Sequence, residues 1–365
     1  MGMSKEFINL SGGDPDAEAP TWAVDATIEA IQTGGAWTHY AAMSDHPEQF
    51  KQAVVDYYRQ FGPEYEPRQV IPTAGSSAAL YIALACALEK GDEVLLWNPF
   101  YAGHKWILDE MGVKMNLAPL LPEINYHPDL DATAEAVTDK TRAVIICNPG
   151  NPTGTVFNEK ELKAVTDLAI DNDMTILSDE IYLHYVYDDH RFISTASLGE
   201  EVKESTINIM SFSKTFSMTG WRLGYDIVPE KYLDKAKRVF SMTGPRPANF
   251  VYAAGIAALR GDFSYVEERR RIYEQRRNYF CKAIDDLGFP CNLFEGAFYA
   301  WFDARSTGLS SDEFVKRLKE EENCLLSPGN WFGVGFDGFI RVPLVRPVPV
   351  LEDVVERVEN FVKGL

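Results

Sequence analysis

A lysine and an arginine stand alone in a long apolar stretch of this 365-residue chain. From Thr206 to Tyr225 the only charged residues are Lys214 and Arg222, so the sequence suggests that both are buried. A buried cation without a partner costs on the order of several kcal/mol. An arginine there suits a bound phosphate, because its guanidinium matches two oxygens at once. A lysine at a strand end is often a plain surface residue, but a desolvated amine can form a Schiff base.

Polar side chains that could act together with Lys214 follow other apolar runs. Asp179 closes the run TILSDE, Tyr182 comes three residues later, and Asn151 follows the run AVIIC. Each of them could merely cap or anchor a loop. Together with Lys214 they suit pyridoxal phosphate, because a carboxylate can pair with the protonated ring nitrogen and keep the ring an electron sink. A phenol and an amide beside the ring oxygen would tune the proton affinity of the Schiff base.

A glycine turn supplies a candidate phosphate site. Gly75, Ser76 and Ser77 precede an apolar helical pattern, and the free N–H groups at a helix start attract anions. The same turn could be only a helix cap. Ser211 and Arg222 could close the same site, so we predict a phosphate bound by this group of residues.

The elements that must position these residues alternate from about residue 47 to residue 260. Helical patterns at 48–60 and 77–89 alternate with apolar runs, which predicts a mostly parallel sheet covered on both faces. Ligands of such sheets bind at the carboxyl ends of the strands, where the polar residues above gather. The last two runs are too close for a crossover, so one of them should be antiparallel. The apolar runs are 93–97, 143–147, 175–180, 207–213 and 223–228.

The pattern changes after about residue 265. A long charged helix leads to strands within 296–304 and 339–345 and to a terminal helix over 351–363. The chain is also longer than the roughly 250–300 residues at which single cores stop growing. We therefore predict a large domain over 20–265 and a smaller α+β domain made of residues 1–19 with 266–365.

Composition narrows the class of protein. A net charge of −19 disfavours nucleic acid and anionic membranes as partners. The longest apolar run, 78–88, is shorter than the roughly 20 residues needed to cross a membrane. The five cysteines form no CxxC pair, which favours a cytoplasmic protein with reduced thiols. The six histidines are scattered without metal-ligand spacing, so we predict no metal site.

The motifs NPGNPTG, SDEIY and SFSKTFSMTGWRLGY, in this order and spacing, resemble the class I aminotransferases of the aspartate aminotransferase type. The resemblance runs from about Gly13 to Arg341. It implies fold type I, with a mostly parallel seven-stranded sheet flanked by helices and a smaller α+β domain. It also implies a role in amino acid metabolism, the transfer of an amino group from an L-amino acid to a 2-oxo acid by a ping-pong mechanism with pyridoxal 5′-phosphate.

The resemblance implies a role for each residue of the predicted cofactor site. Lys214 would hold the cofactor as an aldimine and then move a proton between the substrate α-carbon and the cofactor's C4′. Asp179 would pair with the ring nitrogen, and Asn151 and Tyr182 would bond the ring hydroxyl. The residues implied for the phosphate are Gly75, Ser76, Ser77, Ser211 and Arg222.

Further roles follow from the same resemblance. Tyr101 would stack on the cofactor ring. Tyr40 would reach the phosphate of a neighbouring subunit, which implies an obligate homodimer with shared active sites. Arg341, which could otherwise be a surface cation at a strand end, would grip the substrate α-carboxylate together with Asn151, and Gly13 would lie over that group.

The substrate is less constrained. Ser77 stands where an aspartate-using branch of the family carries a lysine, and Arg246 is the one candidate for a replacement cation, unless it is a loop surface residue. The aromatic residues Trp22, Trp37, Phe100 and Tyr101 would suit neutral or aromatic substrates. A C–S β-lyase is the alternative activity, since elimination uses the same cofactor chemistry. A DNA-binding regulator on this fold is disfavoured because the chain has no basic patch.

Overall fold

The computed structural model describes residues 6–40, 45–243 and 246–365, and its largest sheet has eight strands. Five neighbouring strands are parallel, while β9 runs antiparallel to both β8 and β2, as predicted for the last two apolar runs. In sheet order the strands are β2 (Val70–Thr73), β9 (Gly224–Ile227), β8 (Thr206–Ser211), β7 (Thr175–Asp179), β6 (Thr141–Cys147), β3 (Glu93–Asn98), β4 (Lys114–Leu121) and β5 (His127–Pro128).

The α/β class with a mostly parallel sheet is confirmed, but the sheet exceeds the predicted seven strands by one. The additional edge strand, β5, has two residues and pairs antiparallel with β4. Two residues are too few to form a period in the sequence, which is why this strand was not predicted. Strands β2 and β4 were also not among the predicted apolar runs.

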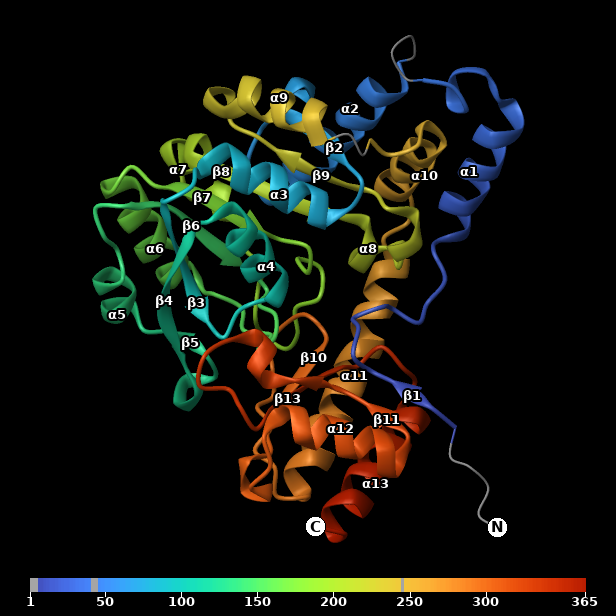
Figure 1. The fold of residues 1–365 in the computed structure, drawn as a ribbon. Coiled ribbons are helices and arrows are strands. Elements are labelled where there is room, and N and C mark those ends of the chain that lie inside the picture. The colour runs from blue at the N-terminus through green and yellow to red at the C-terminus, as the bar shows by residue number, and fades with distance from the viewer. Residues whose placement is uncertain (1–5, 41–44, 244–245) are drawn as a thin grey trace.

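Helices cover both faces of this sheet (Figure 1). In β6, Ala143 and Ile145 pack on one face and Val144 and Ile146 on the other, as the two-residue period of a strand requires. The first face is covered by α3 (Ser76–Ala87), α4 (Ala102–Met111) and α9 (Leu233–Thr243). The second face is covered by α5 (Leu130–Glu135), α6 (Glu159–Asp171) and α7 (Glu200–Ser205). Near β8 and β9 it is covered by α2 (His46–Tyr58) and α10 (Asn249–Arg260). Helix α1 (Thr21–Thr33) packs against α10.

Helix α6 shows how local sequence fixes an element. The Asn158 side chain accepts from the Glu161 backbone N–H, and the Glu161 carboxylate accepts from the Asn158 N–H, which forms a capping box. Leu162, Val165 and Ala169 then recur at helical spacing and are buried against the sheet.

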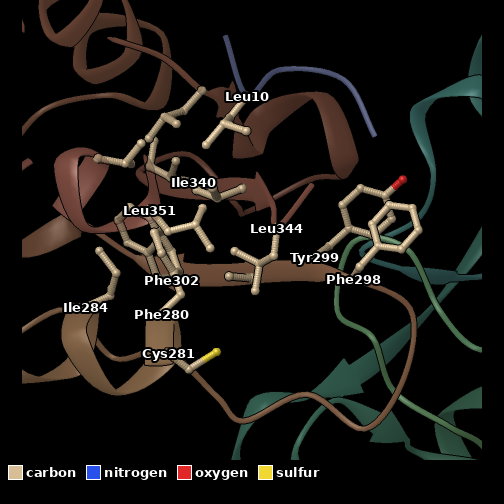
Figure 2. Close-up of a cluster of buried hydrophobic side chains, with 14 of the residues drawn as sticks. Leu10, Phe280, Cys281, Ile284, Phe298, Tyr299, Phe302, Ile340, Leu344 and Leu351 are labelled. Carbon is tan, nitrogen blue, oxygen red and sulfur yellow. The ribbon is translucent and has the colours of Figure 1, made fainter. Parts of the chain in front are cut away.

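The last hundred residues form a second sheet and its helices. A three-stranded sheet in the order β10 (Tyr299–Asp303), β13 (Phe339–Pro343), β12 (Ser327–Pro328) packs with α11 (Ser264–Asp286), α12 (Ser311–Glu322) and α13 (Val348–Lys363). The N-terminal strand β1 (Ile8–Asn9) joins this part by pairing with β11 (Cys324–Leu325). Figure 2 shows the core between these elements, and Leu10, Ile340 and Leu351 belong to this one buried cluster. The exact domain boundaries at 19/20 and 265/266 stay a prediction.

In the described part of the chain, no helix combines the length and the apolar character needed to cross a membrane.

Candidate active site

A cavity of about 560 Å³ lies where the carboxyl ends of the central strands meet the C-terminal sheet and the segment after β1. Because parallel strands end at one edge, residues from distant parts of the sequence converge there. The predicted site residues that line it are Gly13, Ser76, Ser77, Tyr101, Asn151, Asp179, Tyr182, Lys214, Arg222 and Arg341. Gly75, Ser211 and Tyr40 do not line it.

Lys214 lies in the one-turn helix α8 (Phe212–Thr215), not at the end of a strand that runs to residue 213 as predicted. The strand ends at Ser211 because its hydroxyl caps this turn, accepting from the Ser213 N–H at 3.1 Å. The ammonium of Lys214 donates to the Gly13 carbonyl oxygen. Burial, followed by the charge of Arg341, lowers the pKa of Lys214 to about 8. The neutral, nucleophilic amine is therefore accessible near physiological pH.

Asp179 is buried at the end of β7 and is only loosely bonded within the protein. Its Oδ1 accepts from the Ile181 N–H at 3.4 Å, and its Oδ2 lies 3.6 Å from Nε2 of His104. His104 is also buried and its Nε2 has no hydrogen bond within the described residues. Sequence reasoning missed His104, although its position one helical turn after Tyr101 was the available signal.

Tyr182 and Tyr299 meet inside the cavity. Their hydroxyl oxygens are 2.8 Å apart, and burial raises the pKa of both phenols, that of Tyr299 to about 12. Figure 2 shows Tyr299 at the edge of the C-terminal core with its hydroxyl directed away from it. A Cβ on Gly13 would clash with this hydroxyl, so the glycine is needed for the close approach. Tyr299 was not predicted as a site residue, because its partner is 117 positions away.

Arg341 is a buried cation, with 6% of its surface exposed, so it is not the surface residue that its sequence also allowed. Its Nη1 donates to Oδ1 of Asn151 at 3.2 Å, and its Nη2 donates to the Ser11 carbonyl at 2.8 Å. The rings of Tyr299 and Phe332 lie 4.6 and 4.5 Å from the guanidinium carbon. Within the described residues no carboxylate pairs with Arg341 and its Nε has no partner, so the charge is open to an external carboxylate.

The start of helix α3 fits a phosphate. Gly75 has φ 87°, and no side chain caps the helix within the described residues. A Cβ on Gly75 would clash with Arg222, whose guanidinium donates to the carbonyls of Thr219 and Ala74. The free N–H groups, two serines and this guanidinium thus share one side of the cavity.

One prediction about this side needs correction. Arg222 is exposed rather than buried, because its guanidinium lies along the open cavity. Ser211 is buried beside α8, its hydroxyl donates to the Leu223 carbonyl at 3.4 Å, and it is not among the residues that line the cavity, so its role at the phosphate stays a prediction. The hydroxyl that does line it is that of Ser213, whose buried oxygen has no hydrogen bond within the described residues.

Tyr40 lies outside the cavity of its own chain. It is 96% exposed and lines a separate groove of about 970 Å³ together with Arg246. Of the four aromatic residues predicted for the substrate, Tyr101 lines the cavity, whereas Trp22, Trp37 and Phe100 do not. Trp22 packs against Tyr265, and the other two pack into neighbouring clusters.

The residues present fit pyridoxal phosphate. An amine of lowered pKa, a carboxylate with spare acceptor capacity and an uncapped helix start beside an arginine all face the cavity. The unpartnered Ser213 hydroxyl adds a donor that the protein itself does not use.

Comparison with known proteins agrees with this chemistry. Residues 5–358 match the family model "Aminotransferase class I and II". The chain is 35% identical to aromatic-amino-acid aminotransferase 2 of Thermococcus litoralis and 34% identical to an aspartate aminotransferase of Pyrococcus horikoshii. These alignments cover 98% and 99% of this chain and 92% of each relative.

Solved structures give the same result. The crystal structure of an aromatic aminotransferase from Pyrococcus horikoshii matches with a TM-score of 0.92 at 32% sequence identity, over 98% of this chain and 96% of that one. The chain therefore belongs to the class I and II aminotransferases and is a pyridoxal-phosphate-dependent transaminase.

Proposed function

We propose that this transaminase prefers L-amino acids with neutral side chains, aromatic ones included, and passes their amino group to a 2-oxo acid. One observation carries the proposal. Within the described residues, only three cations line the cavity, Lys214, Arg222 and Arg341, and each has a task there. Among the described residues that line the cavity of one chain, no further cation is available to bind the second carboxylate of an acidic substrate.

Lys214 is the proposed catalytic base. Bound pyridoxal phosphate supplies an electron sink for negative charge at the substrate α-carbon. Lys214 would hold the cofactor through its Nζ, and the same amine, once freed by the incoming substrate amine, would be the base that moves the substrate α-proton. Asp179, whose Oδ2 lies 3.6 Å from Nε2 of His104, would pair with the protonated ring nitrogen. Tyr182 and Asn151 would bond the ring oxygen, and the Tyr299 hydroxyl, 2.8 Å from that of Tyr182, would keep Tyr182 in place.

Arg341 is the proposed carboxylate ligand. Its side chain is fixed by Asn151 and the Ser11 carbonyl, so the guanidinium needs little reorganisation when a carboxylate arrives. The two rings that flank it exclude water and strengthen the charge pair.

Asp14 opposes an acidic substrate. Its carboxylate lines the cavity and accepts from the Thr219 hydroxyl at 2.7 Å. A substrate with a second carboxylate would face this negative charge. The relatives' names include both aspartate and aromatic-amino-acid aminotransferases, so the family alone does not choose between them.

The test is the absorption spectrum of the holoenzyme mixed separately with L-phenylalanine, L-alanine, L-glutamate and L-aspartate. We expect conversion to the pyridoxamine form with a kcat/KM for phenylalanine at least about tenfold above that for aspartate. Equal or faster conversion by aspartate would contradict the proposal. Arg246→Ala is the matched control. If aspartate turnover were lost only in this variant, the result would identify Arg246 as a cation supplied by another subunit.

We also propose that the protein is a cytoplasmic homodimer with shared sites. The exposed Tyr40 ring and the groove beside it support a role toward a second copy rather than toward its own cavity. The five free cysteines support a reducing compartment. Tyr40→Phe should weaken cofactor retention without changing the fold, measured as cofactor loss on dilution. A fully active monomer at working concentration would refute the shared site.

A further inference from the structure

Two tryptophans with open ring faces lie at the cavity. Trp106 on α4 is 62% exposed and Trp331 is 50% exposed, and both line the cavity wall. Within the described residues, neither side chain has a hydrogen bond or a ring contact. Large exposed apolar faces beside a functional cavity are typical of a surface that a ligand covers.

The segment that carries Trp331 is held firmly. Trp331 lies in a 3-10 turn (Gly329–Phe332), and the Phe100 N–H donates to the Phe332 carbonyl at 2.7 Å. Asn98 accepts from the Val334 N–H at 3.1 Å and donates to the Val334 carbonyl at 2.9 Å. These bonds fix the backbone that follows Trp331 to the end of β3.

The neighbour of Trp331 places it beside the carboxylate site. The ring of Phe332 packs on the Arg341 guanidinium at 4.5 Å. Trp331 directly precedes Phe332 in the turn and lines the same cavity. A substrate whose α-carboxylate is bound by Arg341 must direct its side chain from this point toward the cavity wall. Apolar surface from Leu80 and Trp106 completes that wall on the side of α3 and α4.

We propose that Trp331, together with Trp106, forms the subsite for the substrate side chain and selects amino acids that carry a flat aromatic ring. Stacking on an indole face rewards such a ring more than a small or branched side chain. The inference depends on the proposed function, because it takes Arg341 as the carboxylate ligand. Trp331 acts on the choice of substrate and takes no part in proton transfer.

The experiment compares Trp331→Ala and Trp331→Phe with Val334→Ala, using the holoenzymes and single-turnover kcat/KM for L-phenylalanine and L-alanine. Val334 is 75% exposed in the same segment and does not line the cavity, so its variant controls for local disturbance. We expect Trp331→Ala to lower the phenylalanine-to-alanine ratio about tenfold or more, chiefly through KM. Trp331→Phe should keep the ratio within about threefold of the unmodified protein, because a stacking ring remains.

The outcomes separate this inference from the proposed function. If the unmodified holoenzyme reacts only with acidic amino acids, the proposed function fails. If it reacts with phenylalanine but the ratio is unchanged in Trp331→Ala, or falls equally in Val334→Ala, only the subsite is refuted. A Trp331→Ala variant that changes oligomeric mass would assign this indole to a subunit contact and would equally overturn the subsite.

Discussion

Asp179 and Glu180 are consecutive carboxylates at the end of β7, yet they serve different regions of the molecule. Asp179 faces the cavity and has one weak backbone donor, at 3.4 Å. Glu180 is fully buried behind the sheet and accepts hydrogen bonds from five groups, in Tyr58, Ser178, Ser194, Thr195 and Asn208. The protein satisfies the second carboxylate itself and leaves the first for a ligand.

Asp226 extends the comparison to a third case. It lies on β9, is fully buried, and neither of its oxygens has a hydrogen bond within the described residues. Burial, and then the charge of Asp179, raises the pKa of Asp226 well above its ordinary value. The three buried carboxylates thus differ in their surroundings. Asp179 faces a ligand cavity, Glu180 is surrounded by protein hydrogen-bond donors, and Asp226 has no donor within the described residues. Burial alone does not identify a functional acid.

The largest expected effect concerns the cavity itself. Lys214→Ala should lower turnover by at least about 10⁴-fold, because it removes both the cofactor attachment and the base. The free energy of unfolding of the apo protein should stay within about 1 kcal/mol, because this amine makes a single bond, to a carbonyl. Steady-state kinetics and urea unfolding check the two parts, and near-normal transamination would refute the assignment.

Asp179→Ala and Glu180→Ala test the contrast directly with the same change at adjacent positions. Asp179→Ala should lower kcat by about 10²–10³-fold with little loss of apo stability, as expected for one electrostatic group at a reacting site. Glu180→Ala should cost about 3 kcal/mol or more of stability, since it leaves several buried donors unpaired. Turnover per folded molecule should survive in Glu180→Ala. If Asp179→Ala lost stability and Glu180→Ala lost turnover instead, the roles given to the two carboxylates would be wrong.

Asp226→Val should stabilise the protein by about 1–3 kcal/mol at pH 8, because it removes an unsatisfied buried carboxyl from an apolar cluster. The folded-state pKa lies above the ordinary value of 3.8, so the unfolded chain ionises first and wild-type stability falls as pH rises above 3.8. The gain should therefore shrink toward pH 4. Urea unfolding at both pH values measures it, and a destabilised variant at pH 8 would reveal a partner for this group.

The smallest expected effect is a pH dependence at Lys214. Only the neutral amine reacts with the cofactor, and the pKa of Lys214 is lowered to about 8. The rate of cofactor attachment to the apo protein should rise about tenfold from pH 7 to pH 9 and then level off. Stopped-flow absorbance measures this rate. A rate that still rises steeply at pH 10 would place the amine in water-like surroundings.

Motifs within one segment were predicted well from the sequence. Lys214, Asp179 and Asn151 each follow an apolar strand, and strand ends of a parallel sheet must converge, so their meeting follows from local pattern and topology. The short spacing between the last two apolar runs also predicted correctly that β8 and β9 are antiparallel.

The residues that were missed act across long separations. Tyr299 meets Tyr182, and Trp331 lies near the carboxylate site, only because the C-terminal sheet packs on the cavity. No residue spacing in a single sequence indicates that the C-terminal sheet packs on the cavity. The same limit applies to Trp22 and Phe100, which we expected near the substrate but which do not line the cavity of their own chain and pack against other residues.

The pairing of β1 with β11 has a consequence for the order of folding. Ile8 pairs with Cys324, so β1 is synthesised long before the strand with which it pairs. Ser11 and Gly13, whose carbonyls hold Arg341 and Lys214, are fixed by that pairing. Contacts of such high sequence separation form late, because closing the long loop costs entropy before any bond repays it. A nascent chain would thus assemble the central sheet before β1 pairs with β11 beside the cavity, and competence to bind substrate would arrive only after β11 has been translated.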